Sequence, residues 1–232
     1  MKSRSMTTRS TSRANSALNC TSIRHRRGAT PDYPGEITPY HGLRITPELS
    51  WGLTPSFEAG LYLPFVRDAQ GDDYFAGPKF RLKWIAQQAP ESGGWFYGIN
   101  TELAVVQSRF AQDRVAIEFR PIVGYRTPDW LVAVNPVLSS PLTQGYRGGG
   151  MDFSPGIKLG KTISTGVQAG VEYYTELGKL ARFKPASEQS RTLFAVIDVD
   201  RKPWVFNLGV GRGLTDATDK WTLKAIFEFP FE

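Results

Sequence analysis

Charged side chains alternate with apolar ones along much of this chain, and they are the residues whose types and spacing could do chemistry. In 115–126, Glu118 and Arg120 share one parity, while Val115 and Ile117 share the other. Successive side chains of a strand point to opposite faces, so the pattern predicts one charged and one apolar face. Charged faces that enclose a lumen can set which solutes pass. The candidate lumen and selectivity residues are Arg44, Glu48, Glu58, Arg81, Lys83, Glu102, Glu118, Arg120, Lys158, Glu172, Asp198, Lys224 and Glu228.

The mixed signs of these charges allow two interpretations. In the one we expect, the charges pair across strands and fill a narrow barrel. In the other, they line a solute path and set its selectivity. A barrel of about 12 strands lies between eight-stranded barrels filled by side chains and wide water-filled porins, so its size does not decide between the two.

Catalytic signals are weak in this sequence. The two histidines are His25, in a basic N-terminal segment, and His41, just before the first alternating segment. A Ser–His–acid triad or a metal cluster would depend on His41 alone, and we expect a rim or lumen histidine instead. The sequence therefore predicts no catalytic residue and no cofactor, and an outer-membrane acyl-chain hydrolase stays as the enzymatic alternative.

Two loop features could bind ligands. The glycine-rich run at 146–150 lacks the strand–loop–helix setting of a phosphate loop, so we expect a flexible external loop. The acidic pairs Asp72–Asp73 and Asp216/Asp219 could bind Ca²⁺ weakly, but solvated loop carboxylates are the better interpretation. No metal site is predicted.

The net charge of +6 misleads if it is spread over the whole molecule. Residues 1–31 contain seven Lys and Arg and no acid, which leaves 21 basic against 22 acidic residues in the remainder. A nucleic-acid-binding surface would need clustered basic residues on the folded body. Nucleic acid is therefore not expected as a partner.

The chain is predicted to divide into a disordered basic leader at 1–35 and one β-domain at 36–232. The leader is rich in Ser, Thr and Arg and cannot bury enough apolar surface to fold. No apolar run of the kind found in secretory signal peptides follows its charges. Three interpretations stay open: a misassigned or truncated start, an organelle transit peptide, and a genuine disordered tail.

Eleven segments with a two-residue period are predicted to be strands. Most have the length of about 9–11 residues with which a tilted strand spans a bilayer. The last segment places Trp221, Phe227 and Phe229 on one face and Lys224 on the other. No apolar run is long enough for a transmembrane helix. The segments are 43–51, 57–65, 80–86, 95–105, 115–126, 130–138, 153–159, 167–174, 192–200, 204–211 and 220–232.

These segments predict an all-β fold: an antiparallel up-and-down transmembrane β-barrel, with eleven visible strands and about 12 in the intact protein. A soluble barrel or sandwich is the alternative, because its strands also alternate. Glycines on the charged face favour the membrane barrel, since small residues make room for long neighbours in a crowded interior. Prolines such as Pro47 and Pro121 remove a ladder donor, and we expect them at strand ends or bulges.

Short and long connections alternate along the chain, as in barrels with short periplasmic turns and longer external loops. The connection at 212–219 is one of the long ones, so the last strand should run toward the periplasm. An even strand number then requires a further strand before residue 41. Nothing in 1–31 is expected to form that strand.

Two stretches resemble a known family. They are WGLTPSFEAGLYLPF at 51–65 and GVGRGLTDATDKWTLKAIFEFPF at 209–231. Over about 40–232 the chain resembles proteobacterial outer-membrane β-barrels of the meta-pathway of phenol degradation (transporter-like) family. This resemblance implies passage of small, often aromatic, compounds across the outer membrane of a Gram-negative bacterium. The chain departs from the family in lacking a visible signal peptide and first strand and in ending at Glu232.

The predicted function is an outer-membrane β-barrel that passes or binds small solutes, with the bilayer and a small molecule as partners. Two alternatives stay open: a structural or lipid-hydrolysing barrel without transport, and a soluble β-barrel binding module. The sequence predicts neither the solute nor the oligomeric state.

Overall fold

The computed structural model describes residues 16–26, 33–37, 42–201 and 204–231. In this part of the chain the single helix is a short 3₁₀ turn, η1 (Arg147–Gly149). No described helix has the length and apolar character needed to cross a membrane. The strands are β1 (Ser16–Arg26), β2 (Leu43–Gly52), β3 (Phe57–Tyr62), β4 (Phe65–Arg67), β5 (Asp73–Phe75), β6 (Lys79–Gln87), β7 (Gly94–Val105), β8 (Val115–Arg126), β9 (Trp130–Asn135), β10 (Leu138–Pro141), β11 (Asp152–Phe153), β12 (Gly156–Ser164), β13 (Val167–Glu176), β14 (Gly178–Lys179), β15 (Arg182–Phe183), β16 (Ser190–Arg201), β17 (Trp204–Gly213) and β18 (Trp221–Phe231).

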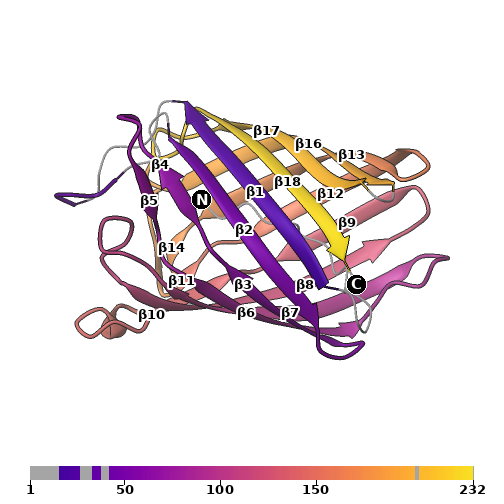
Figure 1. Cartoon of the computed structure of the whole chain (residues 1–232), viewed down its shortest axis with the longest axis horizontal. Coiled ribbons are helices and arrows are strands. Elements are labelled where there is room, and N and C mark those ends of the chain that lie inside the picture. The colour runs from indigo at the N-terminus through magenta and orange to yellow at the C-terminus, as the bar shows by residue number, and fades with distance from the viewer. Residues whose placement is uncertain (1–15, 27–32, 38–41, 202–203, 232) are drawn as a thin grey trace.

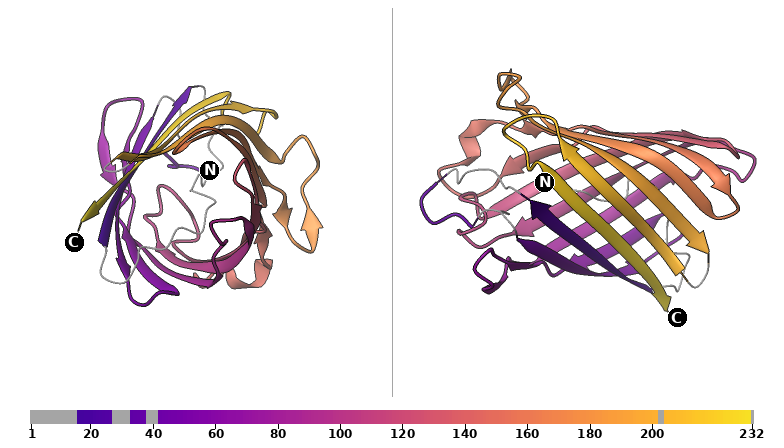
Figure 2. Two further views of the ribbon diagram at one scale, coloured as in Figure 1. Left: turned by 90° about the vertical axis from the view of Figure 1, so that its right-hand side faces the viewer. Right: turned by 90° about the horizontal axis from the view of Figure 1, so that it is seen from above.

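The strands pair antiparallel around a ring (Figures 1 and 2). The long strands pair in chain order as β2–β3–β6–β7–β8–β9–β12–β13–β16–β17–β18. β1 pairs with β2 on one side and with β18 on the other, so the ladder returns to its start. This architecture is the predicted all-β, up-and-down barrel.

The two ends of the barrel differ in their connections. The short pieces β4, β5, β10, β11 and β14 lie at one end, on the left in Figure 1, and we call it the loop end. The opposite end carries short turns such as 127–129 and 165–166, and the C-terminus lies there (Figure 1). We call it the turn end. The predicted alternation of short and long connections is confirmed.

All eleven predicted segments are strands. Three of them are divided into two pieces: 57–65 into β3 and β4, 130–138 into β9 and β10, and 153–159 into β11 and β12. In 130–138 both parities are apolar in the sequence, so the structure is needed to assign its two faces. Leu131 and Ala133 are buried, whereas Trp130 and Val132 are exposed.

The expectation that nothing in 1–31 forms a strand is wrong. Ser16–Arg26 forms β1, and its backbone pairs with β18 over all eleven residues. The strand was not predicted because the prediction depends on local alternation of polar and apolar side chains, which is weak in this segment. Pairing on both sides satisfies the backbone groups of the segment, and that contribution depends on strands far away in the chain. Residues 1–15 lie outside the described part, so the predicted leader stays a prediction there.

Three prolines coincide with the divisions between strand pieces. Pro64 separates β3 from β4, Pro136 lies between β9 and β10, and Pro155 lies between β11 and β12. A proline has no N–H to donate to a ladder, so a break at that position leaves no donor unused. The expected location at strand ends is confirmed for these three.

Pro47 and Pro121 lie inside β2 and β8, which corrects the expectation for them. The carbonyl of Pro47 accepts a hydrogen bond from the Leu63 N–H at 2.9 Å, and that of Pro121 accepts one from Asn135 Nδ2 at 3.0 Å. In an antiparallel ladder, the N–H and C=O of one residue point to the same neighbour. The missing N–H of each proline therefore faces a neighbouring strand that is already divided.

Polar and apolar side chains are distributed inside out on this ring. Large apolar side chains on the outer face are exposed, and they include Phe80, Trp84, Trp95, Tyr125, Trp130, Leu159, Val171, Leu193, Val210, Trp221 and Leu223. Charged and polar side chains of the opposite parity are buried. A water-soluble protein buries most of its large apolar side chains and exposes its charged ones. This barrel has the reverse arrangement.

Glycines on the inner face make room for large neighbours. A Cβ on Gly124 would lie 2.2 Å from the Phe96 ring, and one on Gly211 would lie 2.5 Å from the Phe194 ring. Both rings are almost fully buried. The sequence-based interpretation that these glycines relieve crowding inside the barrel is therefore supported by the geometry.

Gly124→Ala is expected to destabilise the barrel by about 1–3 kcal/mol, the usual range for overpacking. The new methyl would also meet the Val132 carbonyl oxygen at 2.5 Å, so a ring movement alone cannot accommodate it. Denaturant unfolding of refolded protein measures the change. Gly148→Ala is the matched control, because no atom lies within 4 Å of its added Cβ. Equal stability of the two variants would contradict the crowding argument.

Candidate functional site

The predicted lumen charges lie on the inner face of the ring. Asp198, Arg44 and Glu228 are partly exposed there, and the Arg81 side chain is 10% exposed. The remaining candidates are buried: Glu48, Glu58, Lys83, Glu102, Glu118, Arg120, Lys158, Glu172 and Lys224. Two candidate pairs join strands that are not neighbours in the ladder, which is possible only through the lumen: Lys158 on β12 with Asp198 on β16, and Glu172 on β13 with Lys224 on β18.

A first charged cluster lies against β2, β3 and β6. Arg81 forms salt bridges with Glu48, at 2.5 Å, and with Glu58. Lys83 contacts the same Glu58 carboxylate at 3.2 Å. Arg81 also donates to the Tyr62 hydroxyl. The two acids and two bases balance, as buried ionic groups must if they are to remain charged.

A second cluster lies on the inner face between β12 and β18. Glu172 is fully buried and holds two ammonium groups, Lys224 and, at 3.1 Å, Lys158. The Tyr174 hydroxyl donates to the same carboxylate at 2.7 Å. The Tyr174 ring meets the Phe194 ring edge-on at 5.8 Å, and Lys224 lies over that ring at 5.1 Å. We call Lys158, Glu172, Tyr174, Phe194 and Lys224 the central barrier.

The central barrier is extended by polar contacts toward the turn end. Lys158 forms a second salt bridge with Asp198 at 2.7 Å, and Asn207 donates to the other oxygen of Asp198 at 2.8 Å. Lys158 therefore contacts two carboxylates and Glu172 contacts two ammonium groups. The sequence-based expectation of charges paired across strands describes these contacts.

Shorter-range contacts hold two other candidates. Arg120 and Glu118, two residues apart on β8, form a salt bridge at 2.7 Å. Asn100 donates to Glu102 at 3.1 Å on β7. These pairs lie along one wall and do not cross the lumen.

An apolar cluster on the inner face was not expected from the sequence. Phe96, Ile122, Leu131 and Ala133 pack together, and Tyr174 packs against them. Phe96 and Ile122 share the parity of the charged residues of their strands, but only charged residues were selected as lumen candidates. A large apolar residue on an otherwise polar parity is the signal that could have identified them.

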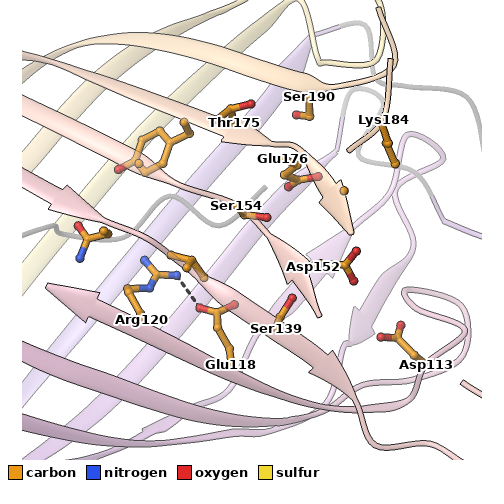
Figure 3. A pocket seen from close by; sticks show the side chains of 15 residues that line it. Asp113, Glu118, Arg120, Ser139, Asp152, Ser154, Thr175, Glu176, Lys184 and Ser190 are labelled. Carbon is orange, nitrogen blue, oxygen red and sulfur yellow. Dashed lines mark hydrogen bonds and ion pairs between the residues drawn. The ribbon is translucent and has the colours of Figure 1, made fainter. Parts of the chain in front are cut away.

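A cavity of about 430 Å³ opens between the strand pieces toward the loop end (Figure 3). We call it the loop-end cavity. Glu118 and Arg120 from β8 lie on one side, with Asp152 and Glu176 from other strands around the same space (Figure 3). Ligand pockets typically have volumes of about 300–1,000 Å³, so this cavity can hold a small molecule.

A second cavity of about 400 Å³ lies toward the turn end, and we call it the turn-end cavity. Lys158, Asp198 and Glu228 contribute charge to its wall, and Leu131 and Ile226 contribute apolar surface. Among the described residues, none lines both cavities. Tyr174 lines the loop-end cavity and Lys158 the turn-end cavity, so the central barrier separates the two.

The remaining candidates from the sequence lie away from the lumen or outside the description. The run at 146–150 contains η1 at the loop end, and all five of its residues are exposed. Asp72, Asp73 and Asp216 are exposed, as expected. Asp219 is buried, which corrects the expectation of a solvated carboxylate at that position. Across the described residues, no group of three or more His, Cys, Asp or Glu side chains could hold a metal ion. His41 and the side chain of His25 lie outside the described part.

Comparisons with known proteins identify the class of fold. No protein-family model matches the chain, and no curated protein matches its sequence. The structure is similar to that of the COG4313 outer membrane channel from Pseudomonas putida F1, with a TM-score of 0.66 and 9% identity over 96% of this chain and 97% of that one. Weaker similarity extends to LpxR from Salmonella typhimurium, with a TM-score of 0.45 and 10% identity over 92% of this chain and 99% of that one. The chain thus has the fold of an outer-membrane β-barrel protein.

Glu172→Leu is expected to destabilise the barrel by about 3–5 kcal/mol, because Lys224 then loses its described salt bridge in a buried site. The double variant Glu172→Leu/Lys224→Met should recover much of this loss, since it removes both charges and Lys158 keeps Asp198. Unfolding of refolded protein by denaturant measures both effects.

The control for this experiment is Asp73→Asn. Asp73 pairs with Arg67 at 2.6 Å, but both side chains are more than half exposed, so little change is expected. A double variant as unstable as Glu172→Leu would contradict the assignment of the loss to an unpaired lysine.

Proposed function

We propose that this protein is an outer-membrane β-barrel that passes or binds small solutes. The inside-out arrangement of the ring is the observation that carries this proposal. Its outer face offers apolar and aromatic side chains to lipid, and its inner face holds charges and two cavities. Membrane barrels have this pattern, with an apolar outer band and a polar lumen. A soluble barrel would expose the opposite faces to water.

The connections support an orientation in the membrane. Short turns of membrane barrels lie at the periplasmic face and long loops outside. We therefore assign the turn end to the periplasm and the loop end to the exterior. In this orientation β18 runs toward the periplasm, beside the start of β1.

Passage through this barrel requires movement at the central barrier. Tyr174 and Phe194 fill the space between the two cavities, and their neighbours Glu172 and Lys224 are buried. A solute that enters the loop-end cavity would have to displace these side chains to reach the turn-end cavity. We therefore propose a narrow path with low conductance instead of an open pore.

The family named above remains our proposal for the origin of this barrel. The resemblance of 51–65 and 209–231 to the phenol-degradation (transporter-like) family supports it and would make small aromatic compounds candidate solutes. Leu131, Phe206 and Ile226 in the turn-end cavity would contact the apolar part of such a compound.

Tyr174→Ala is expected to increase conductance in planar bilayers, because the variant removes a ring between the two cavities. Wild-type protein should show small but resolvable channels. Tyr97→Ala is the matched control, since Tyr97 lies on the outer face and is 47% exposed. The wild-type protein and both variants are purified and refolded in detergent, and heat modifiability verifies that each one is folded.

The passage proposal fails if folded wild-type protein and Tyr174→Ala both show no conductance and no solute uptake by proteoliposomes. A chain that is monomeric and soluble without detergent would instead overturn the membrane assignment. Lipid hydrolysis by the folded barrel would support the enzymatic alternative.

A further inference from the structure

The charges around the loop-end cavity do not balance. Among the described residues, its wall contains four carboxylates, Asp113, Glu118, Asp152 and Glu176, and two basic groups, Arg120 and Lys184. Figure 3 shows these side chains around a common space, drawn from β8, β11, β13 and the adjoining loops. The described wall therefore contains more acidic than basic side chains.

Salt bridges neutralise only part of this wall. Glu118 is paired with Arg120 at 2.7 Å, and Asp152 is paired with Lys179 at 2.8 Å. Within the described residues, Asp113 and Glu176 form no ion pair. Apart from Arg120, which is paired with Glu118, the described wall offers them one basic group, Lys184. The negative charge that remains acts on any solute in the cavity.

The turn-end cavity has a similar composition. Glu91, Asp198, Asp200 and Glu228 line it, against Arg126 and Lys158. Counting the part of the chain that the structure describes, both ends of the path through the barrel are therefore lined by more acidic than basic residues. A cleft of one sign between low-dielectric walls concentrates ions of the opposite sign.

The central barrier and the cluster around Arg81 do not alter this excess. Glu48 and Glu58 balance Arg81 and Lys83, and Glu172 and Asp198 balance Lys158 and Lys224. A permeating ion therefore meets neutral clusters in the narrow part and negative walls on either side. Carboxylates in a wall are the usual basis of cation selectivity.

We propose that this barrel selects small cations, and that Asp113 and Glu176 are the residues of the loop-end cavity that set the preference. The inference rests on the solute passage proposed above and names the class of solute. Hydroxyl groups of Ser139, Ser154 and Ser190 line the same cavity and can accept hydrogen bonds from N–H donors. Small organic ammonium ions therefore belong to the same class as K⁺.

The first experiment measures the reversal potential of the full chain in planar bilayers under a KCl gradient. Wild-type protein is expected to pass K⁺ several-fold more readily than Cl⁻. Asp113→Asn/Glu176→Gln should clearly lower the preference for K⁺, because the double variant removes the loop-end carboxylates that have no salt bridge. The acidic residues of the turn-end cavity should keep the remaining part of the preference. Neither residue has a described partner, so the variant should fold, which heat modifiability on gels verifies.

The matched control is Glu188→Gln/Asp216→Asn. It makes the same change in net charge, but both residues are exposed near the loop end and line neither cavity. Its ion preference should equal that of wild type. An equal loss of preference in this control would assign the effect to general surface charge and overturn the role of Asp113 and Glu176.

The second experiment compares the uptake of butylammonium and butyrate into proteoliposomes. The two solutes have similar size and opposite charge, and butylammonium is expected to enter faster. If wild-type protein conducts but shows no preference for cations in either experiment, this inference is overturned, whereas the proposed passage of solutes still holds. Folded protein that passes no solute at all would reject the proposed passage, and the cation preference would be rejected with it.

Discussion

Buried charges must be neutralised by opposite charges at contact distance, and the rest of this barrel depends on that requirement. An isolated ion within a narrow lumen loses its hydration and gains little from the surrounding apolar groups. Glu172 shows the solution: two ammonium groups and one phenol surround a carboxylate that no water reaches. Because the partners come from β12, β13 and β18, their pairing also fixes strands of the ring that are not neighbours in the ladder relative to one another.

Crowding follows from the same narrow lumen. Long ionic and aromatic side chains need space, and glycines on adjacent strands provide it, as at Gly124 beside Phe96 and Gly211 beside Phe194. The backbone has a related requirement, because each proline lacks an N–H that the ladder would use. Pro47 and Pro121 direct their missing donors toward neighbouring strands that are already divided, so the ladder loses little at these positions. The divisions also open the wall of the loop-end cavity, where Asn135, Ser154 and Gly156 lie.

The sequence predicted most of the fold because membrane strands alternate strictly and each one can be recognised by itself. The parity of the charged residues was therefore sufficient to place Glu48, Lys158 and Lys224 inside the ring. β1 was missed because it is defined by its pairing with β2 and β18, and a periodicity test contains no information on distant partners. The contacts themselves were also out of reach: nothing local in the chain indicates that Glu172 meets Lys224, 52 residues away.

Loop residues escaped prediction for a different reason. Asp113 lies outside any alternating segment, so no parity rule assigns it to a face, and only the folded ring brings it to the wall of a cavity. Tyr174 shares the parity of Glu172 and lies on the charged face, but nothing in the sequence marks a phenol among charges as part of a barrier. Side chains that act by their position between elements need the assembled barrel to be identified.

The distribution of net charge along the lumen follows from hydration. Where the lumen is filled, an unbalanced charge would be buried without compensation. The two lysines of the central barrier, Lys158 and Lys224, are accordingly matched by Glu172 and by the adjoining Asp198. In the two cavities there is room for water, which lowers the energy of an unpaired carboxylate, and there the excess of acid is found. Paired charges at the centre of the lumen stabilise the closed part of the barrel. The unpaired carboxylates of the cavities at its two ends can then discriminate between ions. Stability and selectivity can therefore reside in different residues of one lumen.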